Sequence, residues 1–144
     1  MSPTLTFDIE TIPDVAGIRI LKNTDDKVSD AAVAAMAFKE RLEKTGTEFL
    51  PLHLHRVVAI SCVLRSNEGI RVWSLGGVDD TEAALVQRFF DGIEKFTPQI
   101  ISWNGGGFDL PVLHYRGLLS GVNAPRYWDM GEDDRDFKWN NYIG

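Results

Sequence analysis

Two acidic residues near the start of the chain, Asp8 and Glu10, have the spacing of a pair of metal ligands. They lie at the end of a segment, Thr4–Ile9, whose composition predicts a short β-strand that ends near Pro13. Side chains alternate across a strand, so residues two apart point to the same face. Two neighbouring carboxylates repel each other, and a hard cation such as Mg²⁺ or Mn²⁺ relieves that repulsion. The spacing alone also fits two exposed acids on an edge strand, and that alternative stays open.

A third carboxylate, that of Asp109, is expected to join this pair. It follows a short apolar strand predicted over residues 99–103 and a turn at Gly105–Gly107, and it opens a helix predicted over Asp109–Leu119. A strand that ends at such a turn delivers the next side chain to the end of the sheet. Asp109 would thereby complete a cluster of three oxygen ligands. It could equally cap its helix, which stabilises a helix by about 1 kcal/mol, and the two roles are compatible.

Two further helices are predicted from caps and periodicity. Ser29 caps an Ala-rich helix that runs to about Thr45, whereas residues 11–28 are polar and predicted to be irregular. Asp79 or Asp80 caps the next helix, with Glu82 in its first turn. One face of that helix is apolar and consists of Leu85, Phe89, Ile93 and Phe96.

The strands predict a mixed α/β sheet. Arg56–Arg65 is a nearly continuous apolar run, which is typical of a central strand buried on both faces. A turn at Ser66–Gly69 joins it to a strand over Ile70–Leu75, so the two form an antiparallel hairpin. The later strand–helix–strand order adds a parallel crossover. A fully parallel, doubly wound sheet does not fit the hairpin.

The two acidic segments resemble the first two motifs of the DEDD (DnaQ-like) superfamily of 3′–5′ exonucleases. Phe7–Thr11 (FDIET) resembles the first motif, a D-x-E core on the first strand, and Asn104–Asp109 (NGGGFD) resembles the second, N-x₂₋₃-(F/Y)-D. The longer context, FDIETIPD, HRVVAIS and WNGGGFDLPVL, is similar to that of predicted exonucleases related to the proofreading domain of family B DNA polymerases. The resemblance covers roughly residues 4–142 and implies a ribonuclease-H-like mixed sheet flanked by helices.

The family also has a fourth carboxylate, which comes from a third motif, Y-x₃-D or H-x₃-D, on a late helix. No match follows Asp109: the residue four places after His114 is Leu118, and the one four places after Tyr115 is Leu119. We therefore expect residues 1–144 to form a single exonuclease-like domain that is C-terminally incomplete, and weakly active or inactive as it stands. The chain would then be a shortened form or a fragment of a longer reading frame.

By this resemblance the chain is expected to hydrolyse the terminal phosphodiester at the 3′ end of single-stranded DNA, with RNA also open as a substrate. The cofactor would be Mg²⁺ or Mn²⁺, with two ions in the complete domain. Asp8 would bridge both ions, Glu10 would bind one and help to order the attacking water, and Asp109 would hold the other. The resemblance indicates neither a polymerase partner nor an oligomeric state.

Nucleic-acid contacts are implied at four positions. Thr11 and Ile12 directly follow the first motif, and Asn104 and Phe108 belong to the second. A base stacks on an aromatic ring with about 1–3 kcal/mol, so Phe108 could hold a terminal base. A simple strand end explains Thr11 and Ile12 equally well, and core packing explains Phe108.

Composition excludes some other classes. The net charge of −6 argues against tight binding of nucleic acid by charge alone, although cations bound among carboxylates can supply positive charge locally. The single cysteine, Cys62, excludes an internal disulfide framework. No transmembrane run or signal-like start is present, so we expect a cytoplasmic protein without membrane contact. The alternative function is a non-catalytic nucleic-acid-binding or protein-interaction module on the same fold.

Overall fold

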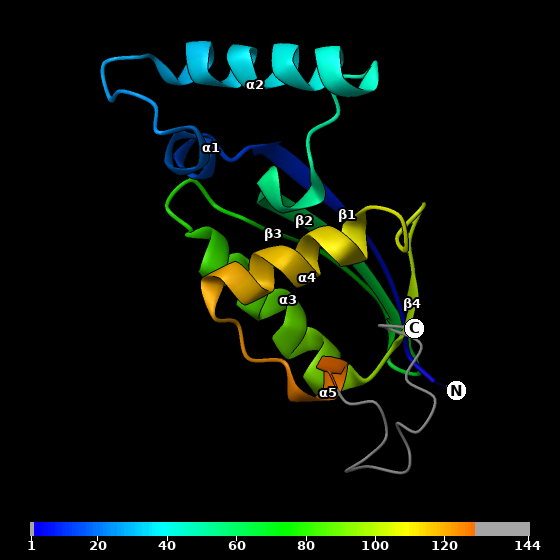
Figure 1. The fold of residues 1–144 in the computed structure, drawn as a ribbon. Coiled ribbons are helices and arrows are strands. Elements are labelled where there is room, and N and C mark those ends of the chain that lie inside the picture. Colours follow the sequence, from blue (N-terminus) through cyan, green and yellow to red (C-terminus); the bar gives the residue numbers. More distant parts are fainter. Residues whose placement is uncertain (1, 129–144) are drawn as a thin grey trace. The chain divides into compact units, whose positions relative to one another are not determined.

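The computed structural model describes residues 2–128, and the chain divides into two compact units (Figure 1). The first unit contains Met1–Glu10 and Val57–Gly144, and the second contains Thr11–Arg56. No helix within the described residues has both the length and the apolar composition needed to cross a bilayer. The acidic pair and Asp109 all belong to the first unit.

Four strands form one sheet in the order β3-β2-β1-β4. They are β1 (Thr4–Pro13), β2 (His55–Ser66), β3 (Gly69–Leu75) and β4 (Gln99–Ile101). The β2–β3 pair is the predicted antiparallel hairpin, with Ser66 opposite Gly69, and β1 and β4 are parallel. The predicted mixed sheet is therefore confirmed.

The first strand shows the expected alternation. Leu5, Phe7 and Ile9 are buried, whereas Asp8 and Glu10 are exposed on the opposite face. The strand ends at Pro13, as predicted, so it extends beyond the first motif. Both acids therefore lie inside a strand whose direction is set by its neighbours.

The second strand is interior in the sheet but only one of its faces is buried along most of its length. Ile60, Cys62 and Leu64 are buried, whereas the alternate residues Ser61, Val63 and Arg65 are exposed. The prediction of burial on both faces is wrong, because the face that carries Ser61, Val63 and Arg65 is exposed. Cys62 lies in this core, and burial raises the pKa of its thiol to about 11.

Helices α3 (Glu82–Phe96), α4 (Asp109–Ser120) and α5 (Pro125–Trp128) complete the described part of the first unit. α3 packs against the buried face of the sheet, where the rings of Phe7 and Phe89 lie 4.9 Å apart. Its cap is Thr81, whose hydroxyl accepts a hydrogen bond from the Ala84 N–H, so the predicted Asp79 or Asp80 cap is wrong.

The second unit contains the predicted Ala-rich helix, α2 (Asp30–Thr45), capped as expected by the Ser29 hydroxyl. It also contains α1 (Val15–Lys22) and a short 3₁₀ turn, η1 (Leu52–Leu54), so the prediction of an irregular segment over residues 11–28 is wrong. Asp14 caps α1 by accepting a hydrogen bond from the Gly17 N–H.

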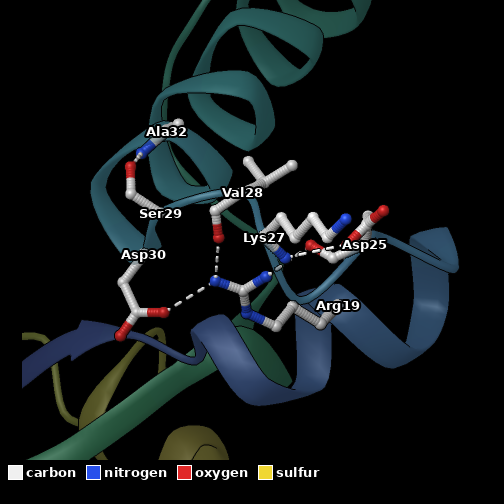
Figure 2. Close-up of polar contacts among 7 residues, drawn as sticks. All are labelled: Arg19, Asp25, Lys27, Val28, Ser29, Asp30 and Ala32. Atoms are coloured by element: carbon white, nitrogen blue, oxygen red, sulfur yellow. Dashed lines mark hydrogen bonds and ion pairs between the residues drawn. The ribbon is translucent and has the colours of Figure 1, made fainter.

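The guanidinium of Arg19 holds the connection between these two helices (Figure 2). It donates to the carbonyls of Asp25 and Val28 at 3.1 and 2.5 Å, and it pairs with the Asp30 carboxylate at 2.8 Å. These contacts fix the path of the polar connection between α1 and α2. The sequence alone does not predict that path.

Candidate metal centre

The loop after β4 returns the chain to the first strand (Figure 1). β4 pairs with β1 only over Thr4–Thr6, and Ile101 is its last residue. Asn104 then adopts a left-handed conformation with φ of 53°, and its carbonyl accepts hydrogen bonds from the N–H groups of Gly107 and Phe108 at 3.0 Å. This tight turn starts α4 at Asp109, beyond the short reach of β4.

Asp109 reaches the edge of β1 between the two acids of the first motif. Its Oδ1 accepts a hydrogen bond of 3.3 Å from the N–H of Ile9, and the residue is only 3% exposed. The contact joins residues that are one hundred positions apart in the sequence. The two motifs that were singled out from the sequence therefore meet in the structure.

The electrostatics show that the carboxylates of Asp109 and Asp8 are neighbours. Burial raises the pKa of Asp109 above its ordinary value, the hydrogen bond from the Ile9 N–H acts in the opposite direction, and the adjacent Asp8 side chain raises it again. A buried carboxylate beside a second one is held in an unfavourable environment unless a proton or a cation neutralises it.

Glu10 does not join this pair. Among residues 2–128 the structure forms no group of three Asp, Glu, His or Cys side chains that could hold a metal ion. Glu10 is exposed, on the same face of β1 as Asp8. By their donor chemistry, Asp8 and Asp109 suit one hard dication such as Mg²⁺ or Mn²⁺, whereas two carboxylates do not make a site for two ions.

The other second-motif residues stay beside Asp109. Asn104 is exposed, and its side-chain oxygen lies 2.5 Å from the position that a Cβ on residue 107 would take, so a side chain there would displace the Asn104 amide. Phe108 is half-buried and immediately precedes α4, for which it provides no side-chain cap. Both residues are thus placed next to the carboxylate that the resemblance assigns to metal.

Thr11 and Ile12 continue β1 past the first motif. Ile12 is 45% exposed. The Thr11 hydroxyl lies 3.1 Å from Nδ1 of His55, whose Nε2 lies 3.1 Å from the carbonyl oxygen of Leu50. Burial lowers the pKa of His55, which favours the neutral ring with Nε2–H donating to that carbonyl and Nδ1 accepting from the hydroxyl. Sequence reasoning missed this histidine, and no spacing rule linked it to residue 11.

Comparison with known proteins agrees with this geometry. Residues 47–144 match the family described as predicted 3′-5′ exonuclease related to the exonuclease domain of PolB. The match begins after the first motif and contains the second. A search of curated proteins found no match.

One solved structure with a similar chain path is that of the family B DNA polymerase from the hyperthermophilic archaeon Pyrobaculum calidifontis. It is 21% identical in sequence, the TM-score is 0.49, and the similarity covers 86% of this chain. The chain spans only 12% of the length of that polymerase.

Proposed function

Since the chain belongs to the family of predicted 3′–5′ exonucleases related to the exonuclease domain of PolB, we propose that it acts on nucleic acid as a metal-dependent 3′–5′ exonuclease with single-stranded DNA as its substrate. The observation that carries this proposal is that Asp109 reaches the first motif, where it hydrogen-bonds to Ile9 and lies beside Asp8. A structural role alone does not explain why a carboxylate is buried beside another carboxylate, because that arrangement is costly without a cation.

In the proposed reaction, the carboxylates of Asp8 and Asp109 bind Mg²⁺ or Mn²⁺. Such an ion, when bound, would supply positive charge against the scissile phosphate and would help to activate the attacking water. Glu10, exposed on the same face of β1 as Asp8, turns toward this group and helps to order the attacking water. A nuclease with a net charge of −6 thus obtains its local positive charge from the cation it binds.

The proposed substrate contacts follow the second motif. Phe108 offers an aromatic face to the terminal base, and Asn104 offers a side-chain amide to the sugar or phosphate. Thr11 and Ile12 remain predicted contacts, with the exposed side chain of Ile12 available for apolar packing. The Thr11 hydroxyl is already engaged by His55, so its contribution would come from its methyl group or backbone.

The test is an exonuclease assay with excess protein, Mn²⁺ and a 5′-labelled single-stranded oligonucleotide. Excess protein makes even slow shortening of the oligonucleotide visible. We expect a ladder of products shortened from the 3′ end, absent in EDTA and reduced by at least about a hundredfold in Asp109→Asn. Glu68→Gln is the matched control, because Glu68 is an exposed acid at the hairpin turn.

Cleavage that persists unchanged in both Asp8→Asn and Asp109→Asn would contradict the proposal. An RNA oligonucleotide of the same sequence, run in parallel, decides between the two substrates.

A second candidate is a module that binds nucleic acid without cutting it. It is favoured by the lack of a three-carboxylate group within the described residues. This module would retain a labelled 3′ end in EDTA, would show no Mn²⁺-dependent shortening, and would bind equally well after Asp109→Asn.

A further inference from the structure

A buried ion pair lies behind the candidate metal centre, on the two helices that pack together there. The guanidinium of Arg116, in α4, donates through Nε to both oxygens of Glu82 at 3.0 and 2.9 Å, and through Nη2 to Oε1 at 2.5 Å. The two side chains are only 7% and 10% exposed. This fork geometry fixes the guanidinium in two directions rather than one.

Glu82 also holds the start of the central strand. Its Oε2 accepts a hydrogen bond of 2.6 Å from the N–H of Val57. One carboxylate in the first turn of α3 therefore joins three elements: β2, α3 and, through Arg116, α4. It is a second polar link between α4 and the sheet, in addition to the hydrogen bond between Asp109 and Ile9 of β1.

The position of Arg116 along α4 matters for Asp109. The two residues are seven apart, which is two helical turns, so they lie on the same side of the helix. α4 starts without a side-chain cap at Phe108. Next to Arg116, Gly117 has no side chain to interlock with α3, where a Cβ would meet Phe90 at 3.5 Å. The forked ion pair adds directional contacts beside this close apolar packing.

Stability alone does not account for this pair. Burying two charges costs desolvation energy, and replacement of such a pair by apolar residues is often neutral or stabilising. A buried pair of this kind can instead select one arrangement of the elements that it joins.

We infer that Glu82 and Arg116 are positioning residues that fix α4 along its axis and thereby keep the Asp109 carboxylate beside Asp8 for metal binding. The inference rests on the proposed function, because it assigns the pair a role at that same metal centre. It predicts that substitutions of Glu82 or Arg116 weaken metal binding. This loss of metal affinity should occur even in a variant whose stability is unchanged.

The experiment measures the dissociation constant for Mn²⁺ by electron paramagnetic resonance of the free ion, together with the melting temperature in EDTA. Arg116→Met and Glu82→Gln are each expected to weaken Mn²⁺ binding about tenfold or more, as changes to groups behind metal ligands commonly do. The double variant Glu82→Gln/Arg116→Met removes both charges and leaves an amide oxygen for Val57 N–H. It should melt near the wild-type temperature and still bind Mn²⁺ weakly.

Two controls separate positioning from general loosening. Arg88→Met removes a surface ion pair with Asp80 from the same helix α3 and should change neither quantity. Ile93→Val thins the core under α3 and should lower the melting temperature while leaving the dissociation constant unchanged.

The inference is overturned if wild type binds Mn²⁺ and the double variant binds it equally well. It is also overturned if Ile93→Val weakens binding as much as Arg116→Met does at a comparable melting temperature. Failure of the wild-type chain to bind Mn²⁺ at all would instead contradict the proposed function and would remove the basis of the inference with it.

Discussion

Among single residues, Asp109 has the most unusual environment for its chemistry. It is buried, accepts a hydrogen bond from the Ile9 N–H, and lies beside a second carboxylate. This environment is unfavourable for a negative charge unless a cation binds. The features that would suit Asp109 to bind a cation therefore destabilise the fold when no cation is bound. Such opposition between function and stability is common at active sites.

The first prediction concerns Asp109→Asn in the absence of metal. Asparagine keeps an oxygen for the Ile9 N–H but carries no charge against Asp8. We expect the melting temperature in EDTA at neutral pH to rise by roughly 2–4 °C. Differential scanning calorimetry of wild type and variant measures it, and Asp25→Asn, at an exposed loop position, is the control. A lower melting temperature in Asp109→Asn would show that the carboxylate is satisfied without a cation.

The second prediction concerns pH and His55. Burial lowers the pKa of His55 in the folded chain, and burial also lowers that of His114. Between the lowered pKa and the ordinary histidine value the unfolded chain binds more protons, so the free energy of unfolding falls as the pH drops through that range. One proton of difference changes it by at most about 1.4 kcal/mol per pH unit.

Urea unfolding at pH 7.5, 6.5 and 5.5 measures this slope. His55→Gln and His114→Gln should each reduce it, and the double variant should reduce it further. A slope that is unchanged in the double variant would mean that other groups govern the acid dependence.

At the level of elements, the sequence predicted most helices and strands but not their details. Ser29 and Gly46 marked both ends of α2 correctly, because capping depends on local chemistry that one residue supplies. α1 was missed because its eight residues are too few for clear periodicity, although Asp14 and Gly17 form its cap. The prediction of an Asp79 or Asp80 cap failed because three consecutive residues can all cap a helix. Asp80 instead accepts from Gly77 N–H and pairs with Arg88.

The third prediction compares two glycines in or after helices. Gly92 lies inside α3 with open space around the position of a Cβ, whereas Gly121 ends α4 with φ of 66°. Gly92→Ala should stabilise the chain by about 0.5–1 kcal/mol, because alanine favours a helix interior. Gly121→Ala should destabilise it by about 1 kcal/mol, because alanine disfavours a left-handed conformation.

Both glycine variants are measured by urea unfolding under the same conditions. Changes of opposite sign in the free energy of unfolding would support the structure of the two helices. A loss of stability in Gly92→Ala would show that α3 packs more tightly at this position than the structure indicates.

For the whole molecule, topology explains why two motifs one hundred residues apart could be paired from sequence. β1 and β4 are parallel neighbours, so segments that follow each of them reach the same region of the sheet. The sequence predicted that Asp109 would come to β1 and that Asp8 and Glu10 would share a face. It could not predict that Glu10 stays out of the pair, because the conformation of an exposed acid depends on which charges and cations are nearby. The Glu82–Arg116 ion pair could not be predicted either, because the two residues are 34 positions apart and follow no local pattern.

The most direct test of this structure is a Mn²⁺ titration of the wild-type chain, Asp8→Asn, Asp109→Asn and the surface control Glu68→Gln, followed by electron paramagnetic resonance. If Asp8 and Asp109 together bind the cation, wild type and Glu68→Gln will bind Mn²⁺ alike, and each of the other two variants will bind at least about tenfold more weakly. Equal Mn²⁺ binding by all four proteins would show that the meeting of these two carboxylates does not form a metal site.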